Sequence, residues 1–270
     1  MKHCVGLLVI FVTLQTHAFA TWSVLAVDQK TGRVVVASAT CVPLEPPRTL
    51  MSVQAVVVPG KGVAACQAAI DVSGRNQTLV FQELQKGTHP SEIVRLLRDD
   101  RQVETRQYGI LDLQGRSATF NGAGNGKVST SFQGSVPAER LFFTIQGNIL
   151  AKEEVVQDAA RAFVAAKGTI TDRVMAAMEA ADRQGGDIRC DCDTMPKSAA
   201  ASCDGRTSHV AYILMANPAD PTGSSFNDGK YLMYLSVTPG NILPNENANP
   251  VKTLRMRYDA HMKQHPELTK

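Results

Sequence analysis

Thr21 is the residue whose type and position suggest chemistry most directly, because it follows a small-x-small tripeptide at residues 18–20. Such a tripeptide is typical of the site that signal peptidase cuts. Cleavage after Ala20 would give Thr21 a free α-amine, and an amine with a pKa of about 7.7–8.0 can act as a general base at neutral pH. The hydroxyl of the same residue would then be a nucleophile for acyl transfer. Ser, Thr or Cys also follows cleavage sites by chance, so the residue type alone does not establish this chemistry.

The first twenty residues have the form of a leader. Lys2 and His3 precede an apolar run at residues 5–12, which is too short to cross a bilayer and has the length of a signal-peptide core. We expect residues 1–20 to be a signal peptide and residues 21–270 to form a single domain, periplasmic or secreted. An uncleaved membrane anchor is the alternative. No other segment is apolar enough to span a membrane, so we expect no membrane association after cleavage.

The composition restricts the class of partner. The chain has 270 residues, a net charge of +3 and 44% hydrophobic residues, enough for a substantial core. Lysine and arginine do not cluster, which argues against nucleic acid as a partner. We expect a small-molecule or peptide-like substrate, and an oligomer is compatible with the composition.

Three cysteines crowd one polar segment. Cys190, Cys192 and Cys203 predict a loop-closing disulfide, either Cys190–Cys203 or Cys192–Cys203. Zinc, with His209 as a fourth ligand, is the alternative. The spacing lacks the usual C-x2-4-C knuckle, so we expect no metal and no other cofactor.

The remaining cysteines have other surroundings. Cys4 lies in the leader, which leaves five cysteines and therefore at least one thiol without an intramolecular partner. Cys41 and Cys66 lie among Ala and Val, and we interpret both as small buried hydrophobic residues.

The pattern of apolar residues predicts an α+β fold. Alternating or β-branched runs predict strands at residues 21–28, 33–40, 52–58, 63–67, 106–113, 116–121, 141–146, 207–216 and 231–237. Helical spacing occurs within residues 79–97, with a start at 89–91, and at 153–166, 171–181 and 251–261. Hairpins interrupted by pairs of helices predict two antiparallel sheets between helical layers.

Five segments resemble the DUF1028 family. They are TWSVLAVD at residues 21–28, GVAACQ at 62–67, RQYGILDLQG at 106–115, QGNIL at 146–150 and GGDIR at 185–189. The resemblance places the chain beside the N-terminal-nucleophile hydrolases and implies their four-layer αββα sandwich. Residues 190–204 depart from the family pattern, and Thr207 and His209 replace the usual Gln and Ala. If this loop lines the pocket, substrate choice would differ from that of shorter relatives.

The resemblance also implies roles for residues beyond Thr21. Asn148, in a predicted strand-to-helix turn, would stabilise an oxyanion. Ser38, on the second strand, would hydrogen-bond the amine of Thr21. A substrate-binding group would comprise Gln146, Asp187, Arg189 and Ser208.

Each of these roles has a structural alternative. Asn148 would serve as a turn residue or helix N-cap, and Ser38 as a core hydroxyl satisfied locally. Asp187 and Arg189 would form a structural ion pair. His209 is predicted to be an ordinary strand residue, because a nucleophile with its own amine needs no histidine.

Two functional hypotheses follow. The first is a hydrolase of a small amide or peptide-like substrate that forms an acyl-enzyme on Thr21. The second is a non-catalytic extracytoplasmic binding protein on the same fold. Residues 33–40 and 52–58 contain no lysine to assist the threonine, in contrast to proteasome-like enzymes.

Overall fold

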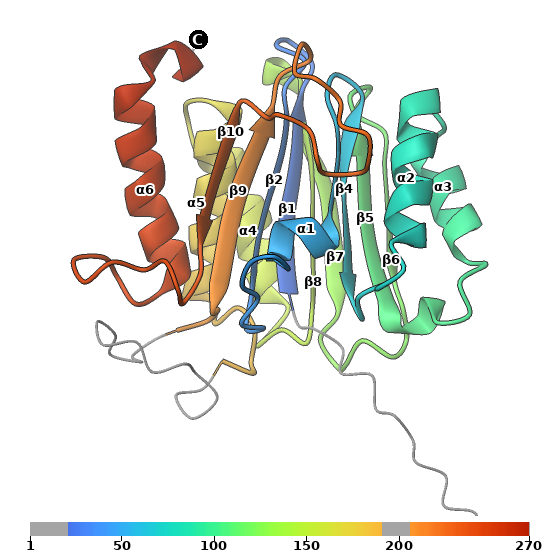
Figure 1. Ribbon diagram of the computed structural model, residues 1–270, viewed down its shortest axis with the longest axis horizontal. Helices are drawn as coiled ribbons and strands as arrows, with labels where there is room; N and C mark the ends of the chain where they lie inside the picture. Colours follow the sequence, from blue (N-terminus) through green and yellow to red (C-terminus); the bar gives the residue numbers. More distant parts are fainter. Residues whose placement is uncertain (1–20, 191–205, 270) are drawn as a thin grey trace, which may run out of the picture.

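A computed structural model describes residues 21–190 and 206–269, and in this part of the chain two antiparallel sheets lie face to face (Figure 1). The six-stranded sheet has the order β10-β9-β2-β1-β8-β7 and the four-stranded sheet the order β3-β4-β5-β6. The strands of the first are β1 (Thr21–Asp28), β2 (Val34–Thr40), β7 (Thr130–Val136), β8 (Leu141–Asn148), β9 (Val210–Ala216) and β10 (Met233–Val237). Those of the second are β3 (Ala55–Val58), β4 (Gly62–Ala68), β5 (Arg106–Asp112) and β6 (Ser117–Asn121).

Helices cover the outer face of each sheet (Figure 1). The six-stranded sheet carries α4 (Glu154–Ala165), α5 (Ile170–Arg183) and α6 (Pro250–Gln264). The four-stranded sheet carries α2 (Arg75–Lys86) and α3 (Pro90–Leu97), and the short helix α1 (Leu50–Gln54) leads into β3. Thr169 and Asp172 form a capping box that begins α5, so the backbone N–H groups of its first turn have partners.

Strand β1 shows why the central strands are apolar on both faces. Trp22, Val24 and Ala26 pack toward the helices, whereas Leu25 and Val27 pack toward the four-stranded sheet. Successive side chains of a strand point to opposite faces, so a strand covered on both sides must be apolar at nearly every position. The polar exceptions on this strand therefore mark a different environment.

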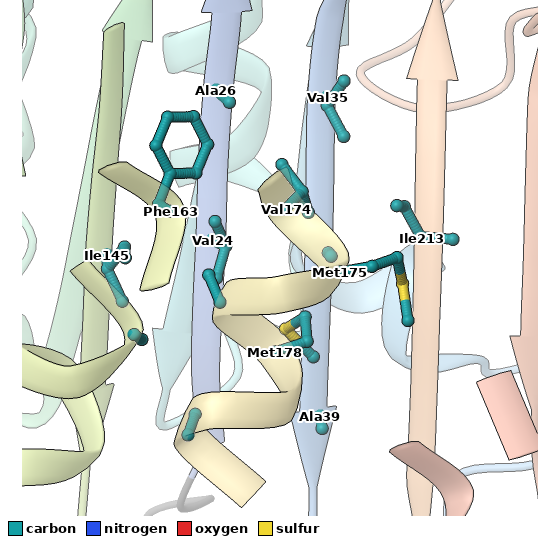
Figure 2. Packing of buried hydrophobic residues seen from close by; sticks show 14 of the residues in the cluster. Val24, Ala26, Val35, Ala39, Ile145, Phe163, Val174, Met175, Met178 and Ile213 are labelled. Carbon is teal, nitrogen blue, oxygen red and sulfur yellow. The ribbon is translucent and has the colours of Figure 1, made fainter. Parts of the chain in front are cut away.

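The largest apolar core lies between the six-stranded sheet and its helices. Val174, Met175 and Met178 of α5 contact the sheet face that carries Val24 and Ile145 (Figure 2). A second core separates the two sheets, and a third lies beneath α2 and α3. Each face that carries apolar side chains is thus buried against another layer.

The predicted α+β class with two antiparallel sheets is confirmed, and two details are wrong. Residues 50–54 form α1 instead of the start of a strand, because Thr49 caps a helical turn with its side chain on the backbone N–H of Ser52. Strand β7 was not predicted. Its sequence TSFQGSV lies at the edge of the sheet with partly exposed side chains and lacks the alternation that identifies a buried strand.

Replacement of Phe163 tests the core between α4 and the sheet. Its ring is fully buried, with its centroid 4.3 Å from that of Phe143. We expect Phe163→Ala to lower the free energy of unfolding by about 3–5 kcal/mol in a denaturant titration, because a large cavity remains. Val164, the next residue, is 46% exposed, and Val164→Ala should change stability by less than about 0.5 kcal/mol. Similar losses for the two variants would contradict this packing.

Candidate functional site

Thr21 is the first residue of β1. Strand β1 begins at the lower end of the sheets in Figure 1. It pairs in register with Thr40 of β2 on one side and Asn148 of β8 on the other. The Thr21 hydroxyl donates to the Thr40 hydroxyl over 3.3 Å. Because the three residues occupy matching positions of adjacent strands, their side chains share the sheet face that looks toward the four-stranded sheet.

A buried polar network begins two residues further along the same face. The hydroxyls of Ser23 and Ser38 lie 2.6 Å apart, and Ser23 donates to the side-chain carbonyl of Gln67 on β4. The amide nitrogen of Gln54 contacts Ser38 at 3.0 Å and the Gln67 carbonyl at 2.9 Å. These side chains are at most 4% exposed. The two sheets are therefore joined at this end by side-chain hydrogen bonds.

Gln67 and Gln107 connect this network to the backbone beside Thr21. The amide nitrogen of Gln67 donates to the Thr21 carbonyl over 3.0 Å and to the Gln107 side-chain carbonyl over 2.7 Å. Gln107 in turn donates to the Gly147 carbonyl over 2.9 Å and to Asn121. The two glutamines, which we call the amide clasp, hold the backbone of β1 and β8 from the opposite sheet.

Gln146 lies deeper between the sheets. Its side chain is fully buried against Gly109 of β5, where an added Cβ would overlap the Gln146 amide. Glycine at position 109 therefore makes room for this amide. Gln146 does not line the cavity beside Thr21, so the structure does not bring it to the predicted substrate group.

Two non-glycine residues with left-handed backbone flank this end of the sheets. Ala68, at the end of β4, has φ 70°, and Ile149, directly after Asn148, has φ 51°. This conformation costs about 1–2 kcal/mol for residues with a Cβ, and such strain is frequent at functional sites. Ala68 also lines the cavity beside Thr21. Two strained positions thus lie at the end of the sheets where the candidate nucleophile lies.

The cavity beside Thr21 is narrow. Its volume is about 10 Å³, close to the space that one water requires, and its lining includes Thr40, Gln54 and Gln67. Thr21 is 2% exposed. An adjacent hollow of about 440 Å³ shares Val53 and Ile70 with this cavity. These two apolar side chains therefore line both spaces.

The lining of the Thr21 cavity is uncharged. Its one ionisable side chain is Cys66, and burial raises the pKa of this thiol to about 12, with a further upward contribution from Asp71. The thiol is therefore neutral at physiological pH. A charge that forms at Thr21 would meet hydroxyl and amide dipoles but no ion among the residues that line this cavity.

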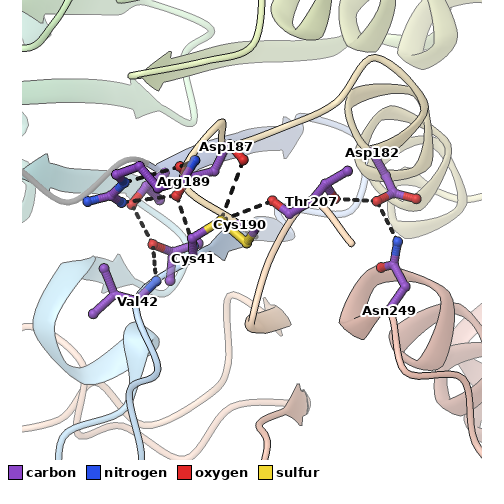
Figure 3. The surroundings of a disulfide bond; sticks show 10 residues. Cys41, Val42, Asp182, Asp187, Arg189, Cys190, Thr207 and Asn249 are labelled. Atoms are coloured by element: carbon purple, nitrogen blue, oxygen red, sulfur yellow. Dashed lines mark hydrogen bonds and ion pairs between the residues drawn. A yellow bond between two sulfur atoms is a disulfide. The ribbon is translucent and has the colours of Figure 1, made fainter. Parts of the chain in front are cut away.

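A second polar centre lies next to Thr40 (Figure 3). The buried carboxylate of Asp187 accepts from the backbone N–H of Cys41 over 2.9 Å and pairs with the Arg189 guanidinium at 3.0 Å. Burial raises the pKa of Asp187, and the hydrogen bonds and charge of Arg189 oppose this effect. Asp187 and Arg189 therefore form an ion pair with each other.

Cys41 and Cys190 form a disulfide in the same region (Figure 3). The predicted pairing of Cys190 with another cysteine of its loop is therefore wrong, as is the interpretation of Cys41 as a plain hydrophobic residue. The sequence separation of 149 residues hides this contact from any local pattern. Cys192 and Cys203 lie outside the described residues. Cys66 is a free, buried cysteine, as predicted.

Comparison with known proteins identifies the family. The sequence model of a family of unknown function, DUF1028, matches residues 21–219. The chain belongs to the DUF1028 family. A solved member, the crystal structure of protein SPO2555 from Silicibacter pomeroyi, is 23% identical with a TM-score of 0.64, covering 90% of this chain and 89% of that one. At this identity the likeness shows the fold alone. No curated protein matches the chain.

In this DUF1028 protein the other predicted site residues take the following places. Ser38 pairs in register with Ser23, and its hydroxyl contacts Ser23 and Gln54. The residue of β2 that pairs with Thr21 is Thr40. Asn148 lies beside Thr21 as the last residue of β8 and not in a turn. The predicted turn is wrong because the strand continues two residues beyond Gln146.

Ser208 and His209 are buried just before β9. The backbone N–H of His209 donates to the Thr40 carbonyl over 2.7 Å, which extends the pairing of β9 with β2. His209 thus acts as a sheet residue, as predicted. Cys190, one of the three cysteines of the alternative zinc set, is engaged in the disulfide with Cys41.

Sequence reasoning missed the amide clasp and Gln54 in this DUF1028 chain. Gln67 closes the segment GVAACQ and Gln107 lies in RQYG, both within motifs that identify the family. The sequence contained a signal for these contacts, because a glutamine on the inward face of an otherwise apolar strand requires a hydrogen-bond partner. Its partners lie on other strands and are not apparent from the sequence. Within residues 21–190 and 206–269, no cluster of metal-binding side chains occurs and no helix is long and apolar enough to cross a bilayer.

Replacement of Gln67 by leucine tests the clasp. The variant removes the hydrogen bonds that the Gln67 amide makes with the Thr21 carbonyl, the Gln107 side-chain carbonyl and Ser23, and a buried polar group that loses its hydrogen bond costs about 1–3 kcal/mol. We expect the free energy of unfolding to fall by at least about 2 kcal/mol in urea titration. Gln133→Leu, at an exposed position of β7, is the matched control and should have little effect. Equal stabilities of the two variants would contradict the role of the clasp.

The disulfide is tested by peptide mapping of the purified protein without reductant. We expect a proteolytic fragment in which Cys41 and Cys190 are joined, and its loss after reduction. Because a disulfide restricts the unfolded chain, Cys41→Ser should lower stability by about 2–5 kcal/mol under oxidising conditions and change little under reducing ones. Linkage of Cys190 to Cys192 or Cys203 would contradict the structure.

Proposed function

We propose that the protein is an extracytoplasmic amide hydrolase whose nucleophile is Thr21, exposed as the N-terminus when residues 1–20 are removed. The observation that carries the proposal is the position of Thr21 as the first residue of a central strand, with its side chain at an uncharged cavity. The match to the DUF1028 family begins at the same residue. The layers of helix and sheet are consistent with the four-layer αββα sandwich of N-terminal-nucleophile hydrolases.

A general base must be neutral to take a proton. The side chains that line the cavity beside Thr21 are uncharged, and the buried carboxylate of Asp187, which accepts from the backbone N–H of Cys41, is paired with Arg189. In the proposal the α-amine of Thr21 is the general base.

The reaction then proceeds in two steps. The amine takes the proton of its own hydroxyl through the one water that the cavity has room for, and Oγ1 attacks the amide carbon. The carbonyl oxygen becomes an oxyanion that the side-chain amide of Asn148, the neighbour on β8, stabilises. The C–N bond breaks, the leaving amine takes the proton, and water hydrolyses the ester on Thr21.

The substrate reaches Thr21 from the adjacent hollow. This hollow of about 440 Å³ has the volume of a small-molecule site, and its walls include Arg48 and Phe226. Val53 and Ile70 must move aside, because they line both the hollow and the cavity. A small amide or peptide-like molecule suits this arrangement.

The disulfide supports the proposed compartment. A bond between Cys41 and Cys190 forms and persists in oxidising surroundings such as the periplasm or the cell exterior. Removal of a signal peptide in the same compartment would create the catalytic N-terminus. Maturation and activation would then be a single event.

One observation favours the alternative of a non-catalytic binding protein. Thr21 is 2% exposed, and its cavity has room for a single water. In that case the 440 Å³ hollow would hold a ligand that Thr21 never reaches.

The proposal is tested by the mass of the mature N-terminus and by turnover of a panel of small amides and short peptides. We expect a start at Thr21, and a loss of about 10³-fold or more in kcat/KM for Thr21→Ala with partial retention for Thr21→Ser. Thr130→Ala, the same change at the start of the edge strand β7, is the control and should retain activity. Ala20→Pro, which blocks cleavage, should abolish turnover. A start at another residue, or equal turnover by wild type and Thr21→Ala, would overturn the proposal, and binding without turnover would favour the alternative.

A further inference from the structure

Another cavity lies at the opposite end of the sheets from Thr21. It has a volume of about 460 Å³, within the range of small-molecule sites. Gln29, directly after β1, lines it, so the length of β1 separates the cavity from Thr21. Eight residues at about 3.3 Å each give roughly 25 Å. This site is independent of the proposed hydrolase activity.

Turns from both sheets line this cavity, which we call the turn cavity. Lys61 comes from the β3–β4 turn, Arg116 follows the β5–β6 turn, and Arg140 precedes β8. Leu84 of α2 and Leu113 add an apolar surface. The cavity thus has cations from three separate turns and an apolar wall.

The charges in the turn cavity are unbalanced. Arg116 forms an ion pair of 2.6 Å with Asp112, the one carboxylate of the lining. Lys61 and Arg140 have no carboxylate within ion-pair distance among the described residues. Three cations and one carboxylate leave a net charge of +2. Two positive groups that face one cavity repel each other, and an anion between them relieves this repulsion.

The backbone of Arg140 provides an independent observation. Its φ of 57° lies in the left-handed region, where a residue with a Cβ costs about 1–2 kcal/mol relative to the right-handed conformation. Glycine would adopt this turn without that cost. Strain of this kind is typical of functional positions. The position carries an arginine, whose guanidinium lines the turn cavity.

Hydrogen bonds hold the lining in place before any ligand binds. Gln29 donates to the Leu113 carbonyl over 3.1 Å and accepts from the Arg140 guanidinium over 3.4 Å. Arg116 also donates to the Gly87 carbonyl over 3.1 Å. A preorganised site loses less side-chain freedom on binding.

We propose that the turn cavity binds a small organic anion with two or more negative charges. Lys61 and Arg140 contact its anionic groups, Arg116 remains paired with Asp112, and Leu84 and Leu113 contact its carbon skeleton. Phosphate esters and polycarboxylates share this chemistry, because guanidinium and ammonium groups bind both.

Calorimetric titration with glycerol 3-phosphate, a phosphate ester, and with citrate, a polycarboxylate, at low salt tests the proposal. We expect binding of at least one of the two anions to the wild-type protein, and at least tenfold weaker binding to Lys61→Gln/Arg140→Gln. The matched control is Lys252→Gln/Lys263→Gln, which removes the same charge from exposed positions of α6. It should alter the affinity less than twofold. The relative affinity for the two anions identifies the class.

Two results would overturn the proposal that the turn cavity binds an anion. One is the absence of binding by either anion up to about 10 mM, the weak end of specific recognition. The other is an equal loss of affinity in the cavity variant and the control, which would show attraction to net charge alone. Thermal unfolding of each variant without anion verifies that it is folded.

Discussion

The hydrogen bonds of Gln67 are the interaction on which this end of the molecule depends. One side-chain amide donates to the backbone of Thr21 and to Gln107, while its carbonyl accepts from Ser23 and Gln54. Buried amides without partners are costly, and a network that satisfies its members permits few other arrangements. Apolar packing brings the two sheets together over most of their area, but apolar contacts have no direction and permit several positions of one sheet over the other. The hydrogen bonds of Gln67 and Gln107 fix that position at the end where the candidate nucleophile lies.

The packing that holds Thr21 in a fixed position also buries it. Thr21 is held on both sides by strand pairing, which is the precision that acyl transfer requires. It is also nearly inaccessible, in a cavity whose lining includes Val53 and Ile70. The strained backbone at Ala68 and Ile149 lies at the same end of the sheets. Strained backbone of this kind is frequent at functional sites, where the surrounding structure holds it in place.

The sequence predicts local features of this protein well and distant contacts poorly. Strand β1 and the helices α4 and α5 follow from periodicity, because each buries a face whose pattern can be read along the chain. Edge strand β7 has no such face. The partners of Thr21 and the Cys41–Cys190 bond depend on which strands and loops become neighbours, which periodicity does not encode. The family motifs located Gln67, Gln107 and Asn148, but only the structure shows what they contact.

The two ends of the inter-sheet layer differ in charge, and their separation makes them electrostatically independent. The Thr21 cavity is lined by hydroxyl, amide and apolar groups, whereas three cations line the turn cavity. About 25 Å lies between them, and the Debye length at physiological salt is about 8 Å. The electrostatic potential of the turn cations is therefore largely screened at Thr21, with or without an anion bound between them. A coupling between the two ends would have to pass along β1, whose hydrogen bonds on both edges resist displacement.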